Sequence, residues 1–281
     1  MKNKLLKTLL IACLIIPCVV LLTACGSDVN WKFWKKTNNT NNIGANVINS
    51  VSFATDSWDI IGKVSAAISG GIDPSFFNYA VGDEKTIMLD TSEEVTLQIW
   101  GFNHDDLSDN DGKAGITIGM KNLLSTTYQM NSTHTNANSW GNSQLRLDAI
   151  MNIMPQLPIE LQAVIKLVNK TTTAGNQLSD LIITQDRLFL FSFFEIRGKG
   201  YADFATIAEG VQYEYWQTIK NGEMVNDCIK ALSNGTGVAT AWWLRSPSMS
   251  SISNFGNIGQ YGNITNTLAH YSLGICFGFC V

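Results

Sequence analysis

The stretch Trp242-Trp243-Leu244-Arg245-Ser246-Pro247 decides how the rest of the chain is read. Consecutive side chains of a β-strand point to opposite faces, so a strand here would bury Trp242 and Trp243 on the two sides of one sheet. Arg245 carries a planar fork of donors that can bond backbone carbonyls or a carboxylate. Two roles for Arg245 therefore stay open, a structural tie inside the fold and a contact to a ligand.

The segment that follows, residues 248–272, is rich in Ser, Asn, Gly and Tyr. Such a composition is typical of binding surfaces, because Tyr gives contact area at low conformational cost and Ser and Asn give adaptable hydrogen bonds. It also fits a low-charge surface hairpin that binds nothing. The residues expected to form a binding surface are Trp242, Arg245, Asn254, Asn257, Tyr261, Asn263, His270 and Tyr271.

The W-L-R-S-P block at 243–247 resembles that of a bacterial family of domains of unknown function, number six-two-seven-three. The resemblance covers Tyr79 to Val281. Its supporting landmarks are Val81-Gly82-Asp83, Trp100 to Asp105, Phe189 to Glu195 and Tyr213 to Trp216. The chain departs from the family at its close, where Ile275-Cys276-Phe277 stands in place of a common Arg-Pro.

The family in turn looks related to C-type lectin-like folds, including the formylglycine-generating-enzyme type. The resemblance implies that the W-x-R-S segment lies in the core and that a closing strand returns beside the first strand. It also implies two classes of function, a binding module and an enzyme with a reactive cysteine pair.

Hydrophobic patterning predicts an α+β domain on independent grounds, with strands at both ends and helices between them. The expected strands are Thr86–Leu89, Val95–Trp100, Gly115–Gly119, Leu188–Ser192 and further strands and turns from Trp242 to Val281. The expected helices are Ser143–Met154 and Pro158–Asn169, with partly helical sequence from Tyr213 to Leu232.

The N-terminus reads as a secretory leader, with basic residues, an apolar run from Leu5 to Leu22 and the cut site Leu22-Thr23-Ala24-Cys25. The alternative is a transmembrane helix, which Pro17 and the small residues of the cut site disfavour. A Cys after Leu-x-Ala is typical of a bacterial lipoprotein, so we expect residues 1–24 to be removed and Cys25 to carry the lipid. The protein would then be extracytoplasmic and anchored to the cell membrane.

The expected organisation after the leader has three parts. Residues 25–46 read as a disordered polar tether, since N-N-T-N-N at 38–42 has little apolar surface to offset its ordering entropy. Residues 47–70 read as one amphipathic helix, either a spacer or a lead-in that packs on the main domain. Residues 79–281 read as the α+β domain, with a boundary between 70 and 81.

Composition limits the partners and the covalent links. The chain of 281 residues is 45% hydrophobic and only 15% charged, and its net charge of -4 disfavours nucleic-acid binding.

Of the cysteines, Cys228, Cys276 and Cys280 remain in the mature domain. On a strand, Cys276 and Cys280 would stand about 13 Å apart, too far for a disulfide. Either Cys228 pairs with one of them, or all three are buried free thiols.

The acidic loop 105–112 is the candidate metal site, with Asp105, Asp109 and Asp111 as calcium ligands. An EF-hand register would need carboxylates at Leu107 and Ile118, which are absent, so a solvated acidic turn is the competing interpretation. No other cofactor is expected.

The sequence contains no set of residues typical of a catalytic site, so we expect a non-catalytic module that binds an extracellular glycan or protein. The alternatives are a formylglycine-generating-type enzyme and a structural envelope lipoprotein.

Overall fold

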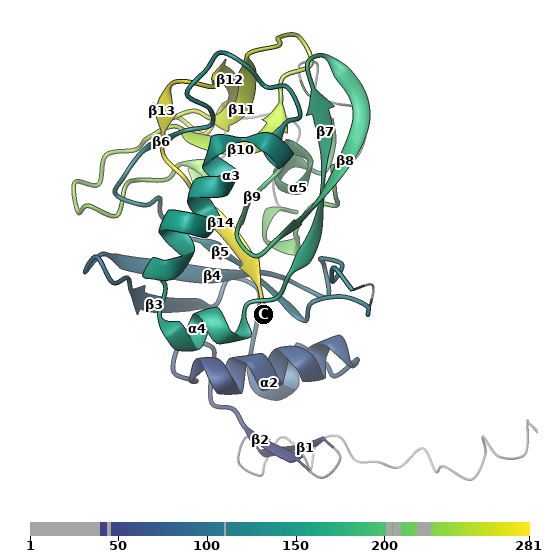
Figure 1. Cartoon of the computed structure of the whole chain (residues 1–281). Coiled ribbons are helices and arrows are strands. Elements are labelled where there is room, and N and C mark those ends of the chain that lie inside the picture. The colour runs from purple at the N-terminus through teal and green to yellow at the C-terminus, as the bar shows by residue number, and fades with distance from the viewer. Residues whose placement is uncertain (1–39, 44–45, 110, 201–203, 205–208, 218–225) are drawn as a thin grey trace, which may run out of the picture. The chain divides into compact units, whose positions relative to one another are not determined.

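A five-stranded antiparallel sheet forms the centre of the fold, in the order β3-β4-β5-β14-β9 (Figure 1). The strands are β3 Glu84–Met88, β4 Glu94–Phe102, β5 Ile116–Met120, β14 Phe277–Cys280 and β9 Phe189–Leu190. Strands from the two ends of the domain therefore share one sheet, as predicted, but the closing strand β14 lies between β5 and β9 and not beside the first strand. This computed structural model describes residues 40–43, 46–109, 111–200, 204, 209–217 and 226–281, and Thr40–Val281 form one compact unit.

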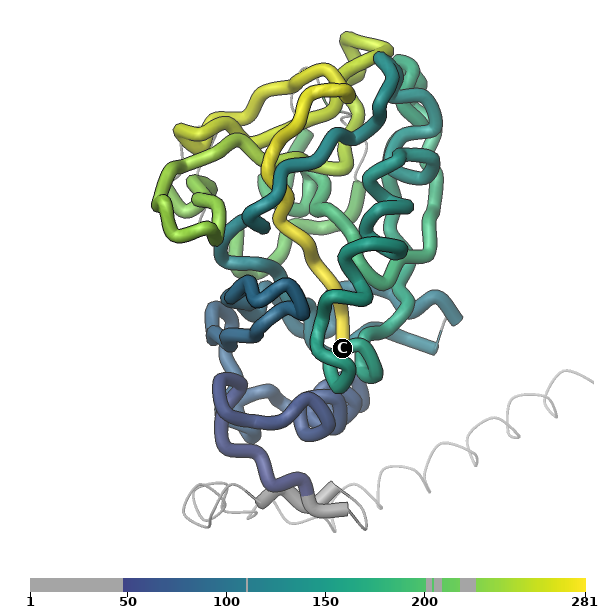
Figure 2. Tube along the Cα trace, turned by 60° about the vertical axis from the view of Figure 1, so that its left-hand side comes forward, coloured from purple at the N-terminus to yellow at the C-terminus, as the bar shows by residue number. Residues whose placement is uncertain are grey.

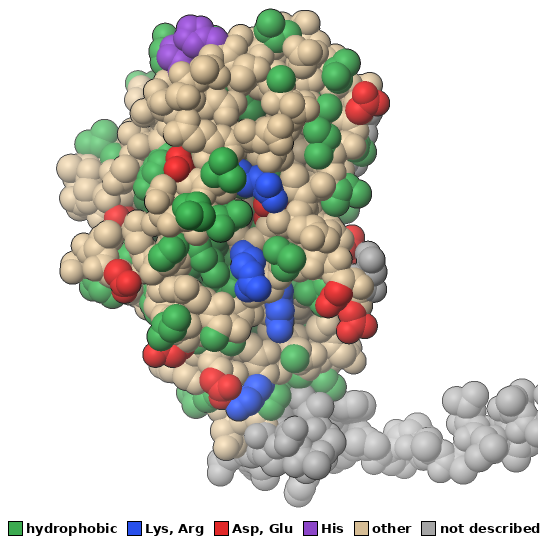
Figure 3. Space-filling model, in the orientation of Figure 1, with side chains coloured by type: hydrophobic (Ala, Val, Ile, Leu, Met, Phe, Trp, Pro, Cys, Tyr) green, Lys and Arg blue, Asp and Glu red, His purple; other side chains and the backbone are tan. Residues whose placement is uncertain are grey.

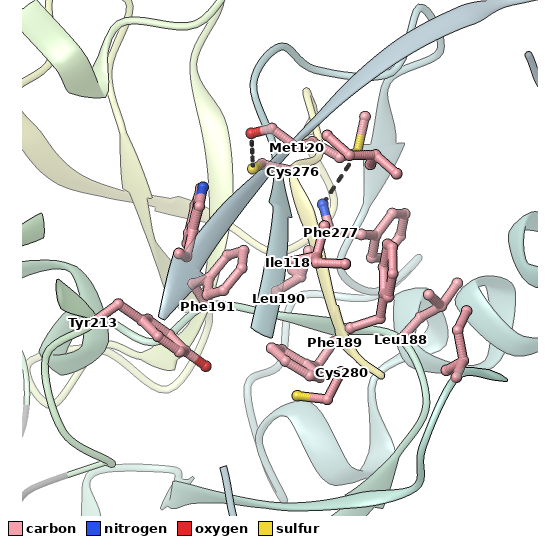
Figure 4. Packing of buried hydrophobic residues seen from close by; sticks show 14 of the residues in the cluster. Ile118, Met120, Leu188, Phe189, Leu190, Phe191, Tyr213, Cys276, Phe277 and Cys280 are labelled. Atoms are coloured by element: carbon pink, nitrogen blue, oxygen red, sulfur yellow. Dashed lines mark hydrogen bonds between the residues drawn. The ribbon is translucent and has the colours of Figure 1, made fainter. Parts of the chain in front are cut away.

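The last strand lies in the interior of this sheet because glycines leave room for aromatic rings. Gly278 of β14 is paired with Gly119 of β5. A Cβ on Gly119 would collide with the ring of Trp100, and a Cβ on Gly278 with the ring of Phe191. These two rings pack against each other with centroids 3.9 Å apart. Figure 4 shows Phe189 and Phe191 beside β14, and Figure 2 shows the C-terminal residues running down between earlier segments.

Three smaller sheets adjoin the central one. They are the antiparallel sheet β10-β11-β12, the hairpin β7-β8 and the pair β13-β6. Their bounds are β10 Trp242–Pro247, β11 Asn254–Ile258, β12 Ile264–Leu268, β7 Val168–Gly175, β8 Leu178–Asp186, β13 Ser272–Leu273 and β6 Tyr128–Gln129. The backbone N–H of Trp243 donates to Gly274 and that of Arg245 donates to Phe191, so β10 is tied to the segments leading into β14 and out of β9.

The helices of the described residues are short. The α-helices are α2 Trp58–Ser69, α3 Gln144–Asp148, α4 Ile159–Val164 and α5 Phe193–Arg197. Helix α3 continues as a π-helical turn, Ala149–Ile153, and a 3-10 turn, Met154–Gln156. Other 3-10 turns are Pro74–Phe77, Trp140–Asn142, Glu214–Trp216 and Asn226–Cys228. The expected helix over Ser143–Met154 is thus present, with Ser143 as its N-cap.

The predicted helix over 47–70 was wrong at its start, since α2 begins only at Trp58. The cause is a polar turn centred on Asp56, whose carboxylate accepts bonds from the Ser50 hydroxyl and the Val51 N–H. The Ser57 side chain then caps the helix. Of the two roles left open, packing on the domain is the one observed, because Ile61, Val64 and Ile68 are fully buried. The expected boundary between 70 and 81 lies within one compact unit.

Two further expectations needed correction. Part of the segment expected to be disordered forms β1 Thr40–Ile43, which pairs antiparallel with β2 Asn46–Asn49. The helix expected to reach Asn169 ends at Val164, because the Lys166 N–H donates to the Cys280 carbonyl and draws the chain into extended structure. The fold is a mixed α and β domain with antiparallel sheets.

Candidate ligand-binding pole and the buried ionic network

Two charge-free stretches of the chain meet at one end of the domain. No Asp, Glu, Lys or Arg occurs between Lys121 and Arg146, and none occurs after Arg245. Strand β13 pairs with β6, and the Asn131 N–H donates to the Ala269 carbonyl at 3.0 Å, which joins the two stretches. We call the surface formed by residues 128–140, 250–254 and 268–273 the neutral pole.

Asn136 holds the neutral pole together from inside. Its side chain is fully buried, and its amide nitrogen lies 2.8 Å from the carbonyl oxygens of Ser251 and Asn254. Its amide oxygen accepts the backbone N–H of Asn176, in the turn of the β7-β8 hairpin, at 2.8 Å. One neutral side chain thus fixes three loops, which gives the pole a defined shape without ionic contacts.

Three aromatic side chains gather on this pole. The imidazole rings of His134 and His270 are stacked with centroids 3.7 Å apart and planes 14° apart, and the ring of Tyr271 follows at 4.6 Å. The Ser253 hydroxyl donates to the His134 carbonyl, and the Gln129 amide donates to the His270 carbonyl. Tyr271 is 52% exposed. Figure 3 shows histidine side chains at the top of the molecule, on a surface with few charged groups.

Only some of the expected binding residues lie together on this surface. His270 and Tyr271 are in the turn after β12, and Asn254 is half-buried next to Asn266, to which its amide donates. Tyr261 and Asn263 are exposed in the turn before β12, at the opposite end of that strand. The surface predicted from the sequence is therefore divided into two ends of one hairpin.

Three other expected binding residues are buried. Trp242 donates its indole N–H to the Cys228 carbonyl, and Asn257 donates to the Thr267 hydroxyl inside the β11-β12 pair. Arg245 is fully buried, and its guanidinium lies within hydrogen-bonding distance of both carboxylate oxygens of Glu195. Of the two roles left open for Arg245, the geometry is that of the structural tie.

A buried ionic network extends from Arg245. Its members are Asp105, Lys170, Glu195, Glu209 and Arg245, each at most 5% exposed. The Lys170 ammonium lies 2.6 Å from carboxylate oxygens of both Asp105 and Glu195. Glu209 accepts the N–H and hydroxyl of Thr173 and the hydroxyl of Ser246. Every charged member is hydrogen-bonded, which is the condition for keeping charges in a core.

Local structure places Glu195 at the centre of this network. It is the third residue of α5 and forms a capping box with Ser192, in which the Ser192 hydroxyl accepts the Glu195 N–H. One carboxylate oxygen also accepts the Ser192 N–H at 2.9 Å. The helix start thereby aims the carboxylate at Arg245 and Lys170, and its negative charge is favourable at the N-terminus of a helix.

The network shifts the acid–base equilibria of its members. Burial opposes the charged form of Asp105, but the Lys170 ammonium overcomes this and holds the pKa of Asp105 well below its ordinary value. Burial likewise opposes ionisation of Glu195, yet Arg245 and Lys170 lower its pKa. Burial disfavours the Lys170 ammonium, while Asp105 and Glu195 raise its pKa. All three groups are therefore charged at neutral pH.

The proposed calcium ligands do not share a site. Asp105 is buried in the network, where it also accepts from the hydroxyls of Thr117 and Tyr213. Asp109 and Asp111 are exposed, and the Asp109 carboxylate accepts the Asp111 N–H. Across the described residues, His, Cys, Asp and Glu side chains form no group of three or more that could hold a metal ion.

The three cysteines of the domain are free and buried. Cys276 donates its thiol to the Met120 carbonyl, as Figure 4 shows, and Cys280 lies next to Thr117 and Asp105. Burial raises the pKa of Cys276, and it raises that of Cys228 to about 12. Burial and the Asp105 carboxylate together raise the pKa of Cys280 well above its ordinary value. Of the alternatives left open, buried free thiols are observed.

Two side chains of the neutral pole, His134 and Asn136, were not expected from the sequence. Both lie outside segment 248–272, to which composition drew attention. The available signal was the second charge-free stretch, residues 122–145, because two stretches of the same unusual composition in one domain point to a common surface. Cys25 and the leader lie outside the described residues, so lipidation stays a prediction.

No helix among the described residues is both long enough and apolar enough to cross a membrane. No curated protein matches the chain, and no solved structure does either. A family model described as "Domain of unknown function (DUF6273)" matches residues 114–281, beginning later than Tyr79, from which the resemblance was expected to run. The matched part contains β10 with its W-L-R-S-P block and the whole neutral pole. The chain therefore belongs to the DUF6273 family.

Proposed function

We propose that this protein is a lipid-anchored, extracytoplasmic binding module that holds a neutral glycan at its neutral pole. The observation that carries the proposal is the stacked pair of His134 and His270, with the tilted ring of Tyr271 beside it, on a surface without carboxylates or ammonium groups. Aromatic faces are apolar and cover a flat ligand surface, while Tyr, Asn and Ser offer hydrogen bonds at their edges. A sugar ring presents both kinds of surface.

A lectin-like fold is the finer proposal for the architecture. It is supported by the closing strand β14, which lies in one sheet with β3, β4 and β5, and by the burial of the W-L-R-S-P block. The glycan site would then lie on the loop that joins β10 to β11 and on the turn after β12. A protein ligand is the competing case, since the same neutral surface suits polar protein segments.

The enzyme alternative draws less support from the geometry. A formylglycine-generating-type reaction needs a reactive cysteine pair, and a thiolate is the reactive form. Burial raises the pKa of both Cys276 and Cys228, which disfavours the thiolate. In the buried ionic network, Asp105 and Glu195 are ion-paired with Lys170 and Arg245, and Glu209 is hydrogen-bonded to Thr173 and Ser246, which suits a structural role better than proton transfer.

Binding is tested by probing the full chain, solubilised in detergent, on arrays of neutral and acidic glycans. The expected result is binding to a neutral subset that weakens little between low and high salt, because no charged group faces the ligand. Uniform absence of signal across neutral glycans, or binding only to acidic ones, would contradict the proposal. A Tyr271→Ala variant on the same arrays checks that the signal comes from the neutral pole.

Anchoring is tested separately. Cells producing the full chain are labelled with a fatty acid and fractionated. We expect the wild-type chain to carry label and to sediment with membranes, and the Cys25→Ser variant to lack label. Label retained by Cys25→Ser would contradict lipidation at this residue.

A further inference from the structure

The neutral pole contains two titratable imidazoles in direct contact. The rings of His134 and His270 are stacked with centroids 3.7 Å apart. They come from two separate segments of the chain, the one between β6 and α3 and the turn after β12. Imidazole is the side chain that ordinarily changes its charge between pH 5 and 8. The charge of this contact therefore depends on pH, on a surface that otherwise carries no charged group.

The two rings differ in their surroundings. His134 is exposed, whereas His270 is half-buried. The Nδ1 atom of His270 is buried and has no hydrogen-bond partner in the part of the chain that the structure describes. A protonated imidazole carries a donor on each nitrogen. A charged His270 in this position would therefore hold a buried N–H donor without an acceptor, which is unfavourable.

The elements that contact the pole carry few groups that could neutralise such a proton. Helix α3 and the β7-β8 hairpin contact the pole by hydrogen bonds. The charged and titratable side chains of the pole and of these elements, other than the two histidines, are Tyr128, Tyr271, Arg146, Asp148, Lys170, Asp180 and Asp186. Arg146 pairs with Asp186, and Lys170 belongs to the buried ionic network. The carboxylates that remain are Asp148, which accepts a bond from a side-chain amide of its own helical segment, and Asp180, which is exposed on β8.

Neither ring of the stack is paired with a carboxylate of the described residues. The histidine that does lie within ion-pair distance of a carboxylate is His104, 3.5 Å from Asp105. Figure 3 shows no Asp, Glu, Lys or Arg side chain bordering the histidines at the top of the molecule. Two protonated rings would therefore repel each other with no counter-charge in contact, so the doubly charged state disfavours the stack.

Separation of the rings would loosen the pole. Beside the stack, the Asn131 N–H donates to the Ala269 carbonyl at 3.0 Å, and this bond joins the two segments that carry the histidines. The ring of Tyr271 lies 4.6 Å from that of His270. Movement of His270 would thus disturb both the backbone contact between the segments and the position of the exposed aromatic ring.

We propose that acid opens the neutral pole: protonation of His134 and His270 separates their rings and releases a bound neutral glycan. The inference rests on the proposed binding function and assigns the regulation of that site. In the neutral state each imidazole offers an apolar face and one acceptor nitrogen to a sugar. In the charged state the acceptor is lost and the ring is more strongly hydrated, so that covering it with a neutral ligand costs more.

Binding of the full chain in detergent to the neutral glycan array, at pH 7.5 and at pH 5.0, tests the release. We expect the wild-type chain to lose about tenfold or more in affinity at the lower pH. The matched variant is His134→Phe, which keeps an aromatic ring in the stack but cannot be charged. Whatever its affinity at pH 7.5, it should change by less than about threefold at pH 5.0, because the second charge is missing. Equal pH dependence of the two chains, or none in the wild type, overturns the proposal.

Hydrogen exchange without any glycan separates a failure of this proposal from a failure of the proposed function. Exchange of the full chain in detergent is followed by mass spectrometry at the same two pH values, with labelling times scaled to the intrinsic exchange rate. We expect peptides covering residues 130–140 and 264–273 to lose about tenfold in protection at pH 5.0 in the wild type but not in His134→Phe. Peptides from α2 should be unchanged in both.

Unchanged protection of the two pole peptides in acid overturns the opening, whether or not a glycan binds. Loss of protection in the wild type, with no glycan bound at either pH, supports the opening and contradicts the proposed ligand instead. Loss of protection that extends to α2 would mean general unfolding in acid and overturns the proposal.

Discussion

The neutral pole and the buried ionic network distribute charge in the opposite way to most domains. Charged side chains are usually exposed and almost never fully buried unless they are paired. Here Arg245, Glu195, Lys170 and Asp105 are buried, while the pole that adjoins them carries no charged side chain. The comparison teaches that Arg245 serves the fold, so that the recognition we propose is left to aromatic and neutral polar groups.

Arg245→Met should have the largest effect. It removes one of the two cations that contact Glu195 and leaves Lys170 alone to compensate both Glu195 and Asp105, so the core holds one carboxylate too many, which costs about 3–5 kcal/mol. Urea unfolding followed by tryptophan fluorescence measures the loss. The double variant Arg245→Met with Glu195→Gln should recover part of it, because Lys170 and Asp105 then remain as a balanced pair. If Arg245→Met unfolds at the wild-type urea concentration, the network is not what stabilises the core.

Acid should destabilise the protein by a smaller amount. The pKa values of Asp105 and Glu195 are lowered in the folded state, so the unfolded chain binds more protons than the folded chain in acid. Their contribution is complete above the ordinary carboxyl value of 4.5 and is lost progressively as the pH falls below it. Urea midpoints between pH 7 and pH 3 measure this slope. In Lys170→Met, Asp105 loses the ammonium that lowers its pKa while burial still raises it, so this variant should be less stable at pH 7 and should lose less stability as the pH falls to 3.

Tyr271→Ala should weaken ligand binding and leave the fold intact. Aromatic contacts contribute about 0.5–1.5 kcal/mol beyond area burial, which corresponds to a loss of affinity of up to about tenfold. The side chain is exposed, so the free energy of unfolding should change by less than about 0.5 kcal/mol. Tyr261→Ala, at the other end of β12, is the matched comparison. Equal losses from both variants would mean that the ligand spans the hairpin.

Ser272→Lys should have the smallest effect. Ser272 is exposed at the start of β13, and an ammonium there adds a charge to a surface that has none. An exposed charge contributes about 0–1 kcal/mol, so affinity should change by less than about fivefold, but binding should become dependent on salt concentration. Titrations at two ionic strengths measure this. A wild-type chain that already shows strong salt dependence would contradict the neutral character of the pole.

The periodicity of the sequence predicted core elements, whereas the closing strand was implied by the family resemblance. It located β4, β5 and the helical segment after Ser143, since alternation and capping are local signals. It failed at Val47, because the apolar spacing continues across a turn. That turn is held by hydrogen bonds to distant residues: the Tyr79 hydroxyl donates to Asp56, and the Ser50 hydroxyl donates to the Phe77 carbonyl. Local patterning carries no information about such long-range hydrogen bonds.

The candidate site was predicted less well than the fold. Composition identified His270 and Tyr271, but it could not separate them from Asn257 and Trp242, because burial depends on which strand covers which. Arg245 was recognised as a possible tie from its donors alone. Its partners Glu195 and Thr172 come from α5 and β7, which no sequence spacing relates to β10.

The position of β14 has a consequence for the rate of folding. Residues 277–280 fill the place between β5 and β9, so a strand from the far end of the domain completes the interior of the sheet. More than a hundred residues separate β5 from β14. The entropy of closing this long loop is lost before the contacts between the two strands form, which slows folding relative to domains whose contacts are local. During synthesis, the edges of β5 and β9 would stay open until the final strand arrives, and in that interval the chain is most prone to aggregate.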